Sequence, residues 1–188
     1  GCWHPGGSGP SKGYNLFEQQ STMRDAVITA LTLNIFNNHC DRIVMANVAQ
    51  LCNNLHCLFL AGGEHAIVTP TYHVYDLYKE HQGGTQIETV VTDKTLSVSA
   101  SERDGVVCVT VANTSYDRDA EIELTAFAKE LGTTAEITTL SADPHAHNTF
   151  EQPTQVVEAD FSEYQVDKTS MKVVLPASSV VEIRVEAV

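Results

Sequence analysis

The order of hydrophobic patterns along this chain is the feature that most restricts its fold. A helical pattern covers residues 22–38, a short continuous apolar run follows at 43–46, and a second helical pattern covers about 70–81. From Thr85 onward the pattern has a period of two, which is typical of antiparallel strands. Gly83 and Gly84 lie where the helical pattern gives way to the strand pattern, so we expect two domains, residues 1–84 and residues 85–188.

Local signals support the first part. Thr22 and Asp25 have the spacing of a helix capping box, and Pro70 suits the first turn of a helix. The run at 43–46 contains no polar residue, which favours a strand covered on both faces. Helix, buried strand and helix in this order predict βα elements of a parallel sheet or a (β/α)8 barrel.

The second part contains eight short candidate strands separated by turn residues and no convincing helix. This pattern predicts an antiparallel β-sandwich or a jelly roll. The candidate strands are 87–91, 96–100, 106–111, 120–127, 135–140, 156–161, 171–175 and 180–185.

Charge and cysteine usage exclude several classes of function. The net charge is −13, most of it after residue 84, and an acidic surface repels phosphate backbones, so nucleic acid is not an expected partner. No segment approaches the length of a membrane span. The five cysteines form no CxxC pair, and we interpret them, Cys52 and Cys57 included, as reduced core thiols of a cytoplasmic protein.

Separated sequence words resemble α-L-arabinofuranosidases of glycoside hydrolase family 51. They are YNLFE at 14–18, MRDA at 23–26, HCDR at 39–42, MANVAQL at 45–51, TPTYH at 69–73 and AHNTF at 146–150. The resemblance implies a (β/α)8 barrel joined to a C-terminal β-sandwich. It also implies a retaining hydrolase that releases terminal α-L-arabinofuranosyl residues from arabinan, arabinoxylan and arabino-oligosaccharides.

The same resemblance assigns two substrate contacts. Trp3 matches an aromatic residue that packs against the bound sugar, and Gln50 matches an amide that hydrogen-bonds the sugar at the end of the eighth barrel strand. Retention needs two carboxyl groups about 5–5.5 Å apart. The resemblance places both catalytic glutamates before Gly1, so we expect the chain alone to be inactive. It implies a homo-oligomer for the full-length protein and neither a metal nor a cofactor, although His145 and His147 have a metal-ligand spacing.

Two further expectations follow from the residues. If the rest of a barrel is missing, the segment 43–46 should expose apolar faces and unpaired edges. The alternative function is a non-enzymatic sandwich module that binds carbohydrate or mediates assembly. Residues 85–188 show no aromatic platform typical of such a module, because Tyr116, Phe127, Phe150, Phe161 and Tyr164 are scattered.

Overall fold

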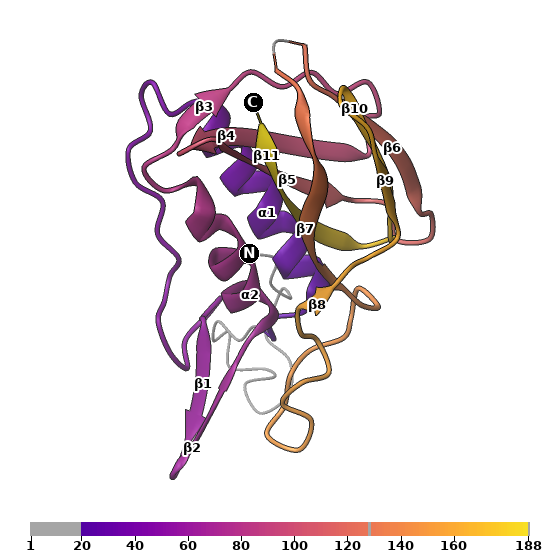
Figure 1. The fold of residues 1–188 in the computed structure, drawn as a ribbon. Coiled ribbons are helices and arrows are strands. Elements are labelled where there is room, and N and C mark those ends of the chain that lie inside the picture. Colours follow the sequence, from indigo (N-terminus) through magenta and orange to yellow (C-terminus); the bar gives the residue numbers. More distant parts are fainter. Residues whose placement is uncertain (1–19, 128, 188) are drawn as a thin grey trace.

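Two antiparallel sheets that face each other form the centre of the structure, a computed structural model that describes residues 20–127 and 129–187 (Figure 1). The larger sheet has the strand order β3-β4-β5-β11-β7-β8 and the smaller has the order β6-β10-β9. In the larger sheet the strands are β3 (Thr85–Ile87), β4 (Leu96–Arg103), β5 (Val106–Asn113), β11 (Ser179–Ala187), β7 (Leu131–Ser141) and β8 (Ala159–Asp160); in the smaller they are β6 (Ala120–Thr125), β10 (Ser170–Leu175) and β9 (Tyr164–Val166).

Alternation along β11 divides its side chains between two cores. Val181, Ile183 and Val185 point between the sheets, where they join a cluster that includes Met171 and Leu175 of the smaller sheet. The intervening positions point to the opposite face of the larger sheet, as the period of two requires. The predicted β-sandwich is therefore confirmed.

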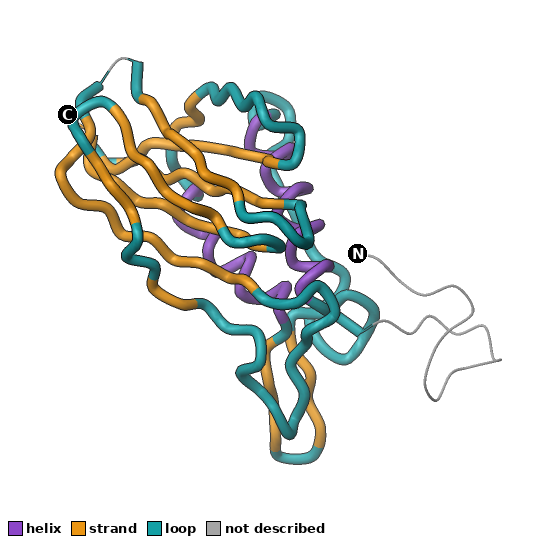
Figure 2. The backbone as a smooth tube through the Cα atoms, turned by 90° about the vertical axis from the view of Figure 1, so that its right-hand side faces the viewer, coloured by secondary structure: helices purple, strands orange, loops and turns teal. Residues whose placement is uncertain are grey.

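Helices α1 (Met23–Asn38) and α2 (Pro70–Tyr78), followed by the 3-10 turn Lys79–His81, cover that opposite face. Figure 2 shows both helices on one side of the strands. The predicted capping box is present, since the Asp25 carboxylate accepts the backbone N–H of Thr22 at 2.9 Å. The helices, β5, β7 and β11 share one apolar cluster. Residues before and after the predicted boundary at Gly84 therefore pack into the same core. No helix within 20–127 or 129–187 is long and apolar enough to cross a membrane.

The strand predicted at 43–46 does not form. Residues 43–48 are irregular, and the side chains of Val44 and Met45 are 93% and 73% exposed. A strand buried on both faces needs hydrogen-bonding neighbours, and the described part of the chain supplies none for this segment. The segment therefore exposes its apolar side chains, which is the outcome expected if the rest of a barrel is missing. The barrel itself is not present in the described structure.

Other predicted strands form with shifted ends. The strand predicted at 87–91 is β3 at Thr85–Ile87, and the strand predicted at 156–161 shortens to β8 at Ala159–Asp160. The structure adds β9 and a hairpin of β1 (Phe59–Gly62) and β2 (His65–Val68), neither of which was among the predicted strands. The hairpin projects from the main body in Figures 1 and 2.

A buried polar network joins the helices to the larger sheet. The side-chain oxygen of Asn34, on α1, accepts hydrogen bonds from Tyr78 Oη at 2.7 Å, Ser99 Oγ at 2.8 Å and Thr110 Oγ1 at 3.0 Å. Its amide nitrogen donates to Ser97 Oγ at 3.2 Å. One fully buried amide therefore connects both helices to β4 and β5.

We expect Asn34→Ala to lower the free energy of unfolding by about 2–4 kcal/mol, because three buried hydroxyls lose a shared acceptor. Asn38→Ala is the matched control. Asn38 is exposed on the same helix and donates only to the Val98 carbonyl, so its loss should cost less than about 1 kcal/mol. Urea unfolding of both variants checks this. Equal costs for the two substitutions would contradict the assigned role of Asn34.

Candidate functional site

Of the two predicted substrate contacts, Gln50 is described and Trp3 lies outside the described residues. Gln50 is exposed in the irregular segment that follows α1, after a cis peptide bond from Ala49. Its Oε1 accepts a hydrogen bond from Asn54 Nδ2 at 2.9 Å. Among residues 20–127 and 129–187 the amide nitrogen of Gln50 has no hydrogen-bond acceptor, so its donor group faces the surface.

The residues after Gln50 are bound to the β1–β2 hairpin. The carbonyl of Leu51 accepts the N–H of Phe59 at 3.0 Å, and the N–H of Asn53 donates to the Phe59 carbonyl at 3.1 Å. The Asn53 side chain donates to the Ala61 carbonyl and accepts the Ala61 N–H, each at 2.8 Å. These bonds fix the position of Gln50 relative to the hairpin.

The loop 143–158 of the sandwich contacts the same hairpin. The side chain of Asn148, 1% exposed, donates to the Val68 carbonyl at 3.1 Å, and it both donates to and accepts from the backbone of Val156. Asn148 belongs to the word at 146–150 that resembles the family. Its role here is to connect the sandwich to the end of β2.

The same loop also binds both helices. The carbonyls of Ala146 and Pro144 accept the first N–H groups of α1, from Met23 at 2.9 Å and from Arg24 at 3.0 Å. Such N–H groups have no partner within their own helix. At the other end of the loop, Glu158 lies 2.9 Å from Nδ1 of His73 on α2. The loop, the helix ends and the hairpin therefore form one connected unit.

Phe150 is the aromatic residue of this loop that contacts the hairpin. An added Cβ on Gly62, in β1, would lie 3.4 Å and 3.5 Å from two carbon atoms of the Phe150 ring, which is ordinary van der Waals contact. The Phe150 side chain is nevertheless 47% exposed. One part of the ring is thus supported by the hairpin while another part faces solvent.

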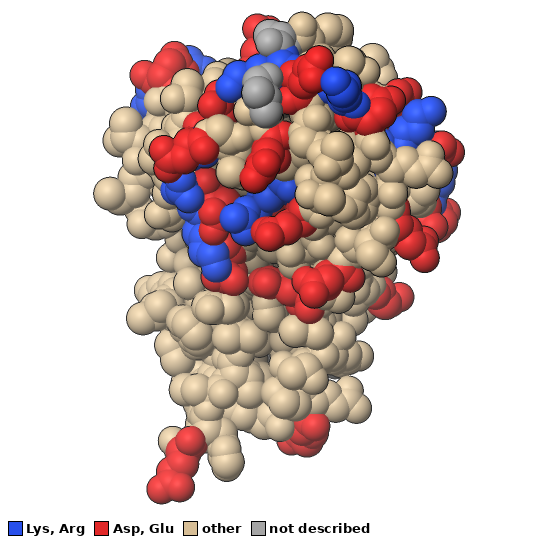
Figure 3. Space-filling view, in the orientation of Figure 1, with Lys and Arg blue, Asp and Glu red and all other residues tan. Residues whose placement is uncertain are grey.

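The surface around Gln50 and the hairpin carries almost no charge. Between residues 43 and 75 the only Asp, Glu, Lys or Arg is Glu64, and between 144 and 157 it is Glu151. Figure 3 shows the corresponding lower part of the molecule as mostly uncharged, below a band of acidic and basic side chains. Asn47, Gln50 and Asn53 are exposed here. Amide groups on a neutral surface suit a neutral, hydroxyl-rich ligand better than an ionic one.

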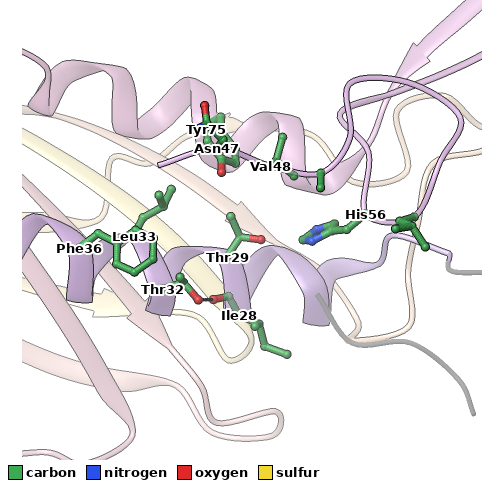
Figure 4. Close-up of a pocket in the computed structure, with 11 residues that line it drawn as sticks. Ile28, Thr29, Thr32, Leu33, Phe36, Asn47, Val48, His56 and Tyr75 are labelled. Carbon is green, nitrogen blue, oxygen red and sulfur yellow. Dashed lines mark hydrogen bonds between the residues drawn. The ribbon is translucent and has the colours of Figure 1, made fainter. Parts of the chain in front are cut away.

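An open groove of about 410 Å³ lies between α1 and the segment 47–56 (Figure 4). Ile28 and Phe36 of α1 line one side, and Val48 and His56 line the other. Burial lowers the pKa of His56 below its ordinary value, and its Nε2 is hydrogen-bonded to Thr71 Oγ1. The groove is mainly apolar, so it lacks the convergent polar groups of a sugar site.

A second cluster with perturbed pKa values lies beneath the 3-10 turn. Cys108 Sγ donates to Glu182 Oε1 at 3.6 Å and lies 3.9 Å from Nε2 of His81, whose Nδ1 is 2.8 Å from Ser101 Oγ. Burial raises the pKa of Glu182 to about 7, lowers the pKa of His81 to about 4, and raises the pKa of the Cys108 thiol.

This cluster is structural. Because burial raises the thiol pKa, Cys108 stays protonated at neutral pH and is a poor nucleophile. Glu182 is only 6% exposed, so substrate has no access to its carboxyl group. Of the other thiols, Cys57 is buried, but Cys40 and Cys52 are exposed, so the core position expected for these two was wrong. Cys2 lies outside the described residues. Among the described residues no group of three His, Cys, Asp or Glu side chains could hold a metal ion.

The fold, an antiparallel sandwich with helices on one face, matches a region of solved glycoside hydrolases. The solved family 51 arabinofuranosidase from Xanthomonas axonopodis pv. citri matches 98% of this chain and 39% of its own, with a TM-score of 0.85 and 30% identity. The arabinose complex of the arabinofuranosidase from Thermotoga maritima covers 92% of this chain and 40% of its own, with a TM-score of 0.76 and 20% identity, and supports the fold alone.

The sequence profile of the α-L-arabinofuranosidase C-terminal domain matches residues 1–179. The chain belongs to that family. It is 34% identical over 202 residues to an intracellular exo-α-L-arabinofuranosidase from Bacteroides ovatus, covering 99% of this chain and 38% of that protein. The chain thus spans about two fifths of the length of these relatives.

Gln50 was predicted from the family resemblance, whereas the hairpin and the loop 143–158 beside it were not predicted. The hairpin did carry a signal, because Gly62-Gly63 between two apolar runs is a turn sequence. Asn148 and Phe150 lie in the family-like word at 146–150, but that word did not reveal their contact with the hairpin, since only the tertiary fold brings their loop against it. The burial of Glu182 was not predicted either, because it too depends on the tertiary fold.

Glu182→Gln should change how stability depends on pH. The folded-state pKa of about 7 exceeds the ordinary 4.5, so the stability from the protonated carboxyl is complete below pH 4.5 and is lost as the pH rises through 7. The difference in the free energy of unfolding between the variant and the parent protein should shift in favour of the variant by about 2–3 kcal/mol as the pH rises from 4.5 to 8. His81 also contributes to the pH dependence of stability, but it is present in both proteins, so its contribution cancels in the comparison. Urea unfolding across this pH range gives the comparison, and parallel pH profiles would contradict the burial assigned to Glu182.

Proposed function

We propose that this chain is the C-terminal portion of a retaining α-L-arabinofuranosidase that removes terminal non-reducing α-L-arabinofuranosyl residues from arabinan, arabinoxylan and arabino-oligosaccharides. The observation that carries the proposal is the match of the family profile to residues 1–179. The relatives from Bacteroides ovatus and Xanthomonas axonopodis support it, because both are arabinofuranosidases and both align with nearly the whole chain.

In this proposal residues 1–84 supply the last βα elements of a (β/α)8 barrel and residues 85–188 form the C-terminal sandwich domain. The exposed apolar side chains of Val44 and Met45 support it, because a strand in a closed barrel would bury them. The apolar groove beside α1 supports it as well, since a mainly apolar groove suits the apolar side chains of neighbouring barrel elements.

Gln50 and Trp3 are the proposed contacts to the terminal sugar, and both catalytic glutamates precede Gly1. An exposed glutamine on a surface with few charged residues supports the role of Gln50, because its amide can donate to and accept from sugar hydroxyls. One carboxyl group would protonate the leaving oxygen and the other would attack the anomeric carbon.

The proposal also includes a cytoplasmic location and a homo-oligomeric full-length protein. The Bacteroides ovatus relative is described as intracellular, which supports the location. The alternative of an independent carbohydrate-binding sandwich is less favoured, because the helices and the sandwich share one apolar core.

The 188-residue chain alone should not hydrolyse nitrophenyl α-L-arabinofuranoside, whereas the same chain joined to the barrel half of the Bacteroides ovatus relative should do so. The reason is that retaining chemistry requires two carboxyl groups that this chain is proposed not to contain. A colorimetric assay of both purified proteins makes the test. Turnover by the chain alone would contradict the assignment of the catalytic glutamates.

In the full-length protein, Gln50→Ala should lower kcat/KM for nitrophenyl α-L-arabinofuranoside by about 10²-fold or more, because a hydrogen bond to the sugar is lost at the reacting unit. Gln165→Ala is the control, since Gln165 is exposed on β9 of the smaller sheet. An unchanged kcat/KM for Gln50→Ala would remove Gln50 from the site.

A further inference from the structure

We propose that Phe150, supported by the β1–β2 hairpin, is a specificity-determining residue that stacks against sugar units beyond the terminal arabinofuranosyl residue. The inference rests on the proposed function and adds a second binding position to the same site. It makes the sandwich loop 143–158 a part of the substrate-binding surface rather than only a structural connection.

Strand β1 connects the region of Gln50 to Phe150. Gln50 is followed directly by Leu51 and Cys52, which pair with Phe59 at the start of β1. Phe150 lies against Gly62 at the end of the same strand. A strand rises about 3.3 Å per residue, so Phe59 and Gly62, the two β1 residues next to which these segments lie, are about 10 Å apart. A ligand whose terminal unit binds at Gln50 can therefore reach Phe150 only if it has further units.

The chemistry of this surface suits a sugar. The ring of Phe150 is about half exposed, and an aromatic face suits the apolar C–H side of a sugar ring. The surface between Gln50 and Phe150 comes from two segments that together contain only Glu64 and Glu151 as charged residues. Asn53 lies on this surface and is exposed. One aromatic ring beside neutral amides is a surface for a neutral oligosaccharide.

Buried hydrogen bonds hold Phe150 and its loop in place. The loop that carries Phe150 is held by the buried side chain of Asn148, which binds the end of β2 at Val68. The ring itself lies beside Gly62, where an added Cβ would be in van der Waals contact with it. A side chain ordered before binding loses less conformational entropy when the ligand arrives. Phe127 offers a contrast, since it is 98% exposed at the end of β6.

The experiment measures kcat/KM of the full-length protein for nitrophenyl α-L-arabinofuranoside, which has one sugar, and for an α-linked arabinotetraose. For Phe150→Ala we expect about a tenfold loss with the tetraose and less than about a twofold change with the nitrophenyl substrate. Phe150→Trp should retain the preference for the tetraose because it keeps an aromatic face. Phe127→Ala is the matched control and should change neither value.

The outcomes separate this inference from the proposed function. If the parent protein hydrolyses neither substrate, the proposed function fails and this inference fails with it. If the parent hydrolyses both, and Phe150→Ala either lowers the two values equally or leaves both unchanged, only this inference is overturned. An equal loss accompanied by a lower melting temperature would identify Phe150 as a packing residue against the catalytic half, which also overturns the inference.

Discussion

The buried amide of Asn34 is the contact on which the arrangement of the structure depends. The face of the larger sheet beneath α1 carries serine and threonine side chains, and apolar packing alone would leave their hydroxyls unsatisfied. Asn34 accepts hydrogen bonds from Tyr78, Ser99 and Thr110, so α1, α2 and two strands meet at one atom. Hydrogen bonds in a buried network are directional, and this network therefore fixes how the helices sit on the sheet.

The residues proposed to bind sugar are held in place by the helices and the sheet that Asn34 connects. The loop 143–158 binds the first N–H groups of α1 and the end of β2, and the hairpin binds the residues that follow Gln50. The position of the candidate sugar contact is thus set by the sandwich as well as by the barrel-like elements. This explains in physical terms why the helices and the sandwich occur in one matched family region.

The parts of the fold that depend on local signals could be predicted from sequence. The α1 helix has its capping box and its apolar spacing within 17 residues, and β11 shows a clear period of two. The segment 43–46 was assigned to the wrong structure, because its pattern indicates a buried strand while burial depends on neighbours that the described residues do not supply. The role of Gln50 came from a family resemblance. The contact between Phe150 and Gly62 joins residues 88 positions apart, and no local pattern encodes it.

The account is tested most directly by a crystal structure of the full-length protein with a bound arabino-oligosaccharide. It predicts that the terminal sugar lies within hydrogen-bonding distance of the Gln50 amide and against Trp3, with a later unit over the exposed face of Phe150. An oligosaccharide bound away from Gln50, for example on the outer face of the smaller sheet, would contradict the account. It would instead identify the sandwich as an independent carbohydrate-binding module.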